Sequence, residues 1–242
     1  MEISSFDTAE ETLRAVAHRV VRSLRETPDL ILGLPAGRTP VGAYAELRRM
    51  HAAGDVDFSR ATSFNLDEFA GIERTHPGSF HRFMAEHLLS GVNLPARRVH
   101  SLNGGAPDLD AECERYEDQL ALAGGIDLQL LGIGANGHIG FNEPGDALVS
   151  RTHRVTLLEA TRRENAALFG GDPAQVPREA LSMGMGTILK ANTVVMIATG
   201  AGKAGSVERM VRGPIVTQLP ASFLQTHRHV EVYLDRSAAA RL

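Results

Sequence analysis

At the centre of the chain stands the segment Asp127-Leu-Gln-Leu-Leu-Gly-Ile-Gly-Ala-Asn-Gly-His-Ile-Gly-Phe-Asn-Glu-Pro-Gly145. It begins as a mostly apolar run that reaches Ile133, and a short run of this kind is typical of a strand buried on both faces. Glycines then interrupt the run, and Pro144 and Gly145 close the segment as a turn. The segment therefore predicts a buried strand followed by a glycine-rich loop.

The loop after this strand is rich in polar side chains, namely Asn136, His138, Asn142 and Glu143. Open parallel α/β sheets bind their ligands at the carboxyl ends of the strands, so a histidine, a carboxylate and two amides at this point make a candidate site. The alternative is a structural role, because a single histidine or asparagine after a strand also serves as a turn or capping residue.

Outward from this segment, strand-like and helix-like patterns alternate along the whole chain. Strands are expected near residues 29–34, 61–66, 99–102, 150–157, 193–199 and 230–234, with helical patterns between most of them. This alternation predicts an α/β fold with a doubly wound, mostly parallel sheet and helices on both faces. We expect a single domain over residues 1–242, in which the segment from about 161 to 178, rich in charges, glycine and proline, forms a mobile lid.

Composition limits the classes of function. The 242 residues are 43% hydrophobic with a net charge of -4, which suits a globular domain and leaves no basic footprint for nucleic acid. A lone cysteine, Cys113, excludes an internal disulfide, and His76 and His81 lack the spacing of a helical zinc pair, so we expect no metal. The N-terminus lacks a signal-peptide pattern and no apolar run reaches membrane-spanning length, so we expect a cytoplasmic protein without membrane partners.

Two further strand-to-helix connections could bind an anion. In Gly33-Leu-Pro-Ala-Gly-Arg-Thr-Pro40, glycines leave main-chain amides open, Thr39 can cap the next helix, and Arg38 adds a guanidinium suited to phosphate. This is not a Walker loop, and a plain strand-to-helix turn is the alternative. Gly200-Ala-Gly-Lys-Ala-Gly205 repeats the pattern, with Lys203 as a possible anion contact.

Two adjacent carboxylates, Asp67 and Glu68, lie where the strand at 61–66 should end. Neighbouring residues of an extended chain point to opposite sides, so we expect at most one of them to face a given site. A solvated acidic turn is the alternative.

Taken together, several motifs resemble the glucosamine-6-phosphate deaminase (isomerase) family. They are Leu34–Pro40, Asn65–Phe69, His76–His81, Gly132–Gly145, Ser150–Thr152 and Ala180–Thr187, and they span nearly the whole chain. The most specific is Gly-His-Ile-Gly-Phe-Asn-Glu-Pro-Gly, at 137–145. The resemblance implies a Rossmann-like enzyme of amino sugar and carbohydrate metabolism, which converts glucosamine 6-phosphate and water to fructose 6-phosphate and ammonia without a metal or other cofactor.

The resemblance also implies catalytic roles for four residues. His138 carries the proton that opens the sugar ring, and Glu143 orients or polarises His138. Asp67 moves a proton from C2 to C1 as the base. Asn136 stands where family members carry either aspartate or asparagine, and as an amide it can only act as a hydrogen-bonding relay partner.

For the phosphate, the resemblance implies contacts from Gly37, Arg38, Thr39 and Lys203. Many members have serine at the position of Arg38 and a phosphate-binding arginine on the lid, where this chain has Ala167. This paired change motivates the hypothesis that Arg38 supplies the charge missing from the lid. It also leaves room for a different amino- or phosphosugar.

Two other functions remain as alternatives. A sugar-phosphate lactonase shares the fold and a Gly-His pair, but Asn142-Glu143-Pro144 favours the deaminase. A non-catalytic phosphosugar sensor would have no need of the proton-shuttling set Asp67, His138 and Glu143. Because little chain follows the last expected strand, we predict an unregulated monomer or small homo-oligomer.

Overall fold

The computed structural model describes residues 1–242, and its largest element is a seven-stranded sheet in which every neighbouring pair of strands is parallel. The strand order is β1-β10-β9-β6-β2-β3-β5. The bounds are β1 Glu2–Phe6, β2 Ile31–Leu34, β3 Thr62–Asn65, β5 Val99–His100, β6 Leu128–Gly132, β9 Thr193–Ala198 and β10 Val230–Asp235. The predicted parallel sheet is confirmed, while the edge strand β1 was not predicted.

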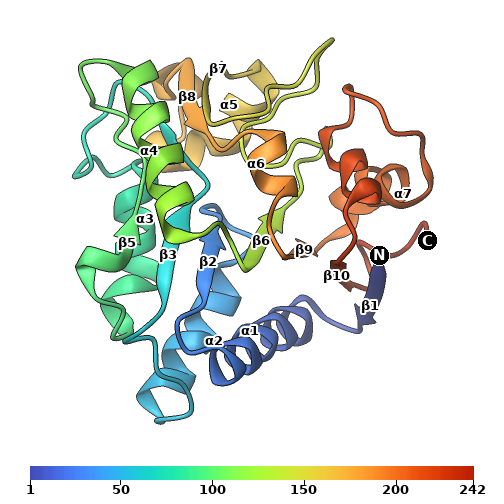
Figure 1. Ribbon diagram of the computed structural model, residues 1–242. Helices are drawn as coiled ribbons and strands as arrows, with labels where there is room; N and C mark the ends of the chain where they lie inside the picture. Colours follow the sequence, from blue (N-terminus) through green and yellow to red (C-terminus); the bar gives the residue numbers. More distant parts are fainter.

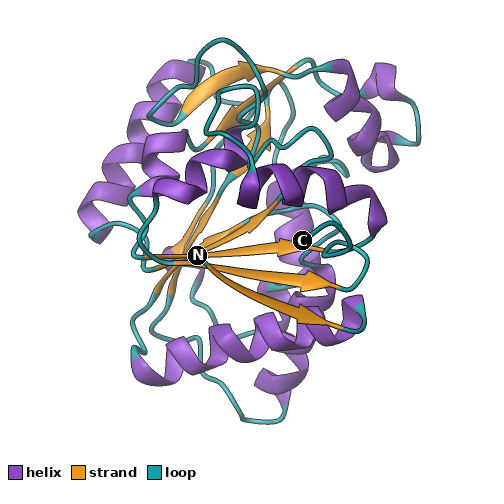
Figure 2. Ribbon diagram, turned by 90° about the vertical axis from the view of Figure 1, so that its right-hand side faces the viewer, coloured by secondary structure: helices purple, strands orange, loops and turns teal.

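Helices cover both faces of this sheet, as the sequence predicted (Figure 1, Figure 2). Their bounds are α1 Ala9–Glu26, α2 Val41–Ala52, α3 Phe80–His87, α4 Leu109–Ala123, α5 Glu159–Asn165, α6 Met185–Leu189 and α7 Ala204–Arg212. Short 3₁₀ turns link them at Leu89–Gly91, Ala96–Arg98, Ala166–Phe169, Pro173–Gln175, Ala201–Lys203 and Pro220–Thr226. No helix is both long enough and apolar enough to cross a membrane.

Alternation along the central strands divides the core into two layers. On β9, Val195 and Ile197 pack with α1 and α2, whereas Val194 and Met196 pack with α4, α6 and α7 on the other face. Each buried strand therefore needs apolar side chains at consecutive positions, which is why these strands read as continuous apolar runs.

A second, three-stranded sheet was not predicted, and the strand expected near 150–157 belongs to it, as β7, and not to the parallel sheet. It has the order β4-β8-β7 with antiparallel pairing, over Asp67–Phe69, Glu179–Ser182 and His153–Thr156. A third apolar cluster packs beside it, in which the rings of Phe69 and Phe169 are 5.0 Å apart and those of Phe80 and Phe141 are 5.6 Å apart. This cluster joins the small sheet to α3 and to the segment after α5.

Glu68 fixes α3 against this small sheet. Its carboxylate is 2% exposed and accepts hydrogen bonds from the Ser79 hydroxyl at 2.7 Å and from the main-chain amides of Phe69, Phe80 and His81 at 2.9 Å each. A carboxylate at a helix N-terminus satisfies amides that have no partner inside the helix. The alternative of a solvated acidic turn is wrong, because both acidic residues at this point are buried.

We expect Glu68→Ala to lower the free energy of unfolding by roughly 3 kcal/mol or more, because it leaves several buried donors without an acceptor. Urea unfolding of the variant beside the wild type measures the loss. Glu114→Ala, on the exposed face of α4, serves as the control and should change stability by less than about 0.5 kcal/mol. Equal stability of the two variants would contradict the anchoring role of Glu68.

Candidate active site

The candidate site lies where four neighbouring strands of the large sheet end. Because β9, β6, β2 and β3 are adjacent and parallel, the loops after their carboxyl ends meet at one edge of the sheet. The segments that follow these ends hold Lys203, His138, Arg38 and, at the start of β4, Asp67, which the sequence placed after four separate strands. The position agrees with the general rule for ligand sites in open α/β sheets.

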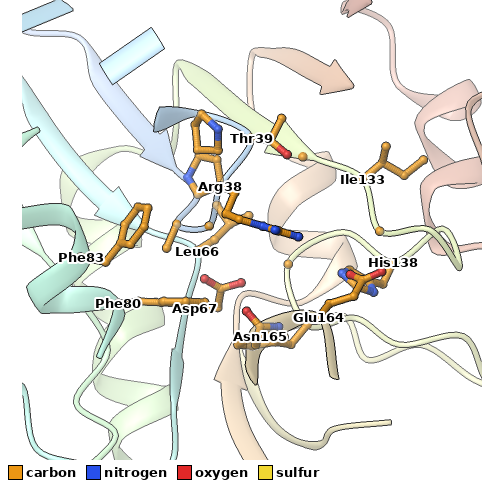
Figure 3. Close-up of a pocket in the computed structure, with 18 of the residues that line it drawn as sticks. Arg38, Thr39, Leu66, Asp67, Phe80, Phe83, Ile133, His138, Glu164 and Asn165 are labelled. Atoms are coloured by element: carbon orange, nitrogen blue, oxygen red, sulfur yellow. The ribbon is translucent and has the colours of Figure 1, made fainter. Parts of the chain in front are cut away.

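A cavity of about 250 Å³ opens at this edge (Figure 3). Loops of the large sheet form one side, and α3 with the segment from α5 onward forms the other. The residues that line it include Gly37, Arg38, Thr39, Asp67, Phe80, Phe83, Gly134, His138, Glu164, Asn165, Ala167 and Lys203. The cavity thus combines cations, carboxyl groups, an imidazole and aromatic rings.

Asp67 lies in the wall of this cavity, at the start of β4, and its neighbour Glu68 points away to the α3 anchor. The expectation that the two carboxylates separate is therefore confirmed. Asp67 is 7% exposed and its Oδ1 atom has no hydrogen-bond partner. Burial, with a smaller contribution from the charge of Glu68, raises the pKa of Asp67 to about 8. Such a carboxyl can both take up and release a proton near neutral pH.

His138 faces the cavity from the glycine-rich loop after β6. Its main-chain amide donates to Asn136 Oδ1 at 3.1 Å, and its carbonyl accepts from the Gly134 amide at 2.9 Å. A Cβ atom at position 134 would lie 2.4 Å from the imidazole, so glycine is required there for the ring to pack. Burial lowers the pKa of His138, while the carboxylates of Glu143 and Glu164 oppose this shift and Lys203 adds to it.

Glu143 and Asn136 lie behind His138 and are not among the residues that line the cavity. Glu143 Oε2 is 3.7 Å from His138 Nδ1, an electrostatic contact longer than a hydrogen bond. The same oxygen accepts from Asn136 Nδ2 at 3.3 Å, and Glu143 Oε1 accepts from the amide of Leu158 at 3.1 Å. Glu143 therefore connects the loop after β6 to the residue that precedes α5.

The loop after β2 has the shape of an anion site. Gly37 adopts a left-handed φ of 94°, and the amides of Gly37, Arg38 and Thr39 donate to no acceptor within the protein. The predicted cap role of Thr39 is wrong, because Pro40 is the N-cap residue of α2 and no side chain caps this helix. Pro40 itself adopts helical dihedral angles, so the turn closes without Thr39, which lines the cavity instead.

Two cations share this end of the cavity. Lys203, in the 3₁₀ turn after β9, lines the same cavity as Arg38. The pKa of Lys203 is lowered by burial and, to a smaller extent, by the positive charge of Arg38, whereas Glu164 opposes the shift. Both cations therefore lie in the lining of one cavity, and their charges interact.

The structure brings most of the predicted site residues together in one cavity. Those that line it are Gly37, Arg38, Thr39, Asp67, His138 and Lys203. Asn136 and Glu143 contribute from behind the imidazole. Asn142, a candidate of the same loop, is structural, because its side-chain amide donates to the carbonyls of Ile139 and Met183 at 2.9 and 2.8 Å.

Sequence reasoning missed several residues of the opposite wall. Phe80 and Phe83 come from α3, and Glu164 and Asn165 come from the end of α5. The segment 161–178 was singled out by its composition, but nothing in the sequence showed which of its side chains turn toward the cavity. Ala167 also lines the cavity, so a longer side chain at this position would enter it.

Comparisons with known proteins agree with this geometry. Residues 4–234 match the sequence profile of the family described as glucosamine-6-phosphate isomerases/6-phosphogluconolactonase. The chain is 46% identical to glucosamine-6-phosphate deaminase 2 of Bacillus subtilis, covering 100% of this chain and 98% of that one. It is also 46% identical to glucosamine-6-phosphate deaminase 1 of Giardia intestinalis, covering 92% of this chain and 84% of the relative.

Solved structures give the same result. A monomeric glucosamine-6-phosphate deaminase superposes with a TM-score of 0.97 at 41% identity, with 100% of both chains covered. The 6-phosphogluconolactonase of Trypanosoma brucei has a TM-score of 0.76 at 22% identity, over 100% of this chain and 98% of that one, and this likeness shows the shared fold alone. The chain therefore belongs to the glucosamine-6-phosphate deaminase (isomerase) family of enzymes.

Proposed function

We propose that this enzyme converts glucosamine 6-phosphate and water to fructose 6-phosphate and ammonia. The observation that carries the proposal is one cavity in which a buried carboxyl, Asp67, and an imidazole, His138, face a space bordered by Arg38 and Lys203. The first pair can move protons and the second pair can hold a phosphate. Relatives with 46% identity over nearly full length are glucosamine-6-phosphate deaminases, which supports the same substrate.

Ring opening is the first step, and His138 performs it. Burial lowers the pKa of His138, so its imidazole is neutral at neutral pH and can accept the proton of the anomeric hydroxyl. The same nitrogen returns this proton to the ring oxygen as the C1–O5 bond breaks and the aldehyde forms. Glu143, 3.7 Å from Nδ1, stabilises the transient imidazolium, and Asn136 holds Glu143 in place.

Asp67 then transfers the proton. As a carboxylate it removes the proton from C2, and O1 takes a proton from the C2 ammonium, which gives an enolamine. The protonated Asp67 then delivers its proton to C1, which leaves a hydroxymethyl group at C1 and an iminium at C2. Water adds to C2, and the resulting carbinolamine expels ammonia to give the ketone. A carboxyl with a pKa of about 8 suits both halves of this transfer.

The phosphate binds at the loop after β2 in this proposal. The free amides of Gly37, Arg38 and Thr39, the guanidinium of Arg38 and the ammonium of Lys203 provide donors and positive charge. Arg38 thereby replaces the arginine that many relatives carry on the lid, where this chain has Ala167.

We further propose that residues 161–178 act as a lid within a single domain of residues 1–242. Arg162 donates hydrogen bonds to the carbonyls of Pro173 and Val176 at 2.8 and 3.2 Å, so the two ends of this segment are held together. The contact of Glu143 with the Leu158 amide ties the start of α5 to the catalytic loop. A monomer is proposed because the solved relative with a TM-score of 0.97 is described as monomeric.

We expect ammonia release from glucosamine 6-phosphate and its loss, by at least about 10³-fold, in Asp67→Asn, because the amide cannot take up the C2 proton. A coupled ammonia assay measures both, with galactosamine 6-phosphate and unphosphorylated glucosamine tested in parallel. Release of ammonia from another sugar would assign a different substrate to the enzyme and leave the proposed mechanism unchanged. If none of the three sugars yields ammonia and the enzyme hydrolyses a sugar-phosphate lactone to the free acid, the proposal would be overturned in favour of a lactonase.

A second prediction concerns pH. Because burial raises the pKa of Asp67 to about 8, its carboxylate form increases with pH, and kcat/KM should rise toward that value. In the unfolded chain, Asp67 releases its proton near the ordinary pKa of about 4. As pH rises from about 4 to about 8, the wild type therefore loses stability relative to Asp67→Asn, by up to about tenfold in the folding equilibrium per pH unit. Urea unfolding across this range measures the difference, and a difference independent of pH would contradict the raised pKa.

A third prediction tests the phosphate contact. Arg38→Ala should raise the Michaelis constant for glucosamine 6-phosphate by about tenfold or more, because a charge-assisted contact with the phosphate is lost. Arg48→Ala is the matched control, since Arg48 lies on α2 and contacts the carbonyl of Glu86 at 3.1 Å outside the cavity. An unchanged Michaelis constant in Arg38→Ala would show that the arginine does not replace the lid contact.

A further inference from the structure

Glu164 is an acidic residue in the cavity that the proposed mechanism does not use. It occupies the last turn of α5, is exposed, and lines the cavity opposite the sheet. In Figure 3 its side chain extends from the lid side toward His138. The carboxylate is near enough to both His138 and Lys203 to act on them electrostatically. A negative charge on the lid therefore faces a site that is otherwise cationic.

The other acidic groups of the site do not supply this charge. Asp67 is buried, and its pKa of about 8 keeps it largely neutral at neutral pH. Glu143 lies behind His138, where Asn136 and the Leu158 amide occupy its oxygens. Glu164 is thus the carboxylate that a bound ligand meets at the open side of the cavity.

The arrangement of charges in the cavity favours one orientation of a ligand that carries a phosphate at one end. A phosphate is attracted to Arg38 and Lys203 and repelled by a carboxylate, so Glu164 disfavours a phosphate on the lid side. The sugar carbons that react must lie between Asp67 and His138, beside which Glu164 extends. Their substituents are the groups that this carboxylate can contact. A cationic substituent at that position would form an ion pair with Glu164, whereas a hydroxyl would not.

We propose that Glu164 is a specificity residue that accepts a hydrogen bond from the C2 ammonium group of an amino-sugar phosphate and so selects it over the corresponding hydroxyl sugar. This inference rests on the proposed function for the orientation of the sugar. A ligand with a phosphate at one end and an ammonium near its reacting carbon matches the cations of the sheet side and the anion of the lid. Asn165, the next residue of the wall, has its side-chain amide occupied by the Thr161 carbonyl at 2.9 Å.

The test compares two ligands that differ only at C2. Dissociation constants of glucosamine 6-phosphate and glucose 6-phosphate are measured by calorimetry in the Asp67→Asn background, where no turnover occurs, at a pH that keeps the amine protonated. Adding Glu164→Gln should weaken binding of the amino sugar by about tenfold, the range of a charge-assisted hydrogen bond. Binding of glucose 6-phosphate should stay the same or tighten, because a negative charge near the phosphate is removed.

The control is Glu159→Gln on the same helix, where Glu159 pairs with Arg163 on the exposed side and lies outside the cavity. It should change neither constant. Equal effects of Glu164→Gln on both ligands, or no effect on either, would overturn the role of Glu164 while ammonia release by the wild type could still hold. Absence of ammonia release with ligand-selective binding intact would instead overturn the proposed function alone, and failure of both ligands to bind would overturn both.

Discussion

Parallel pairing of β9, β6, β2 and β3 is the constraint on which the rest of this site depends. In a parallel sheet all carboxyl ends lie at one edge, so residues separated by long stretches of sequence are brought to one place. Each central strand contributes one chemical component there: Lys203, His138, Arg38 and Asp67. The helices that return the chain cover both faces of the sheet and keep this edge open.

Asp67 and Glu68 show how the fold gives two adjacent carboxyl groups opposite environments. Glu68 is buried but accepts hydrogen bonds from three main-chain amides and a hydroxyl, which partly offset the cost of removing its carboxylate from water. Asp67 is buried with an unpartnered oxygen, so desolvation dominates and its pKa rises to about 8. The alternation of an extended chain separates the two groups, and the helix amides of α3 determine which of them is stabilised as an anion.

The charged side chains that line the cavity are divided between the loops of the large sheet and the segment from α5 onward. Arg38 and Lys203 lie on the sheet side, while the segment from α5 onward contributes Glu164 and the small side chain of Ala167. This division motivates both the assignment of the phosphate to the sheet side and the assignment of Glu164 to the amino group. Because Glu143 accepts a hydrogen bond from the Leu158 amide, the start of α5 is tied to the loop that carries His138.

The sequence by itself determined the parallel sheet, its principal strands and six of the residues that line the cavity, because continuous apolar runs and glycine-rich loops are local signals. It could not determine the small antiparallel sheet, since β4 and β8 are short and meet only by long-range pairing at Asp67–Phe69 and Glu179–Ser182. Tertiary structure alone decided that Asn136 and Glu143 lie behind His138 and that Glu164 faces the cavity. Orientation toward a shared cavity depends on how distant segments pack, and no local pattern of residues encodes it.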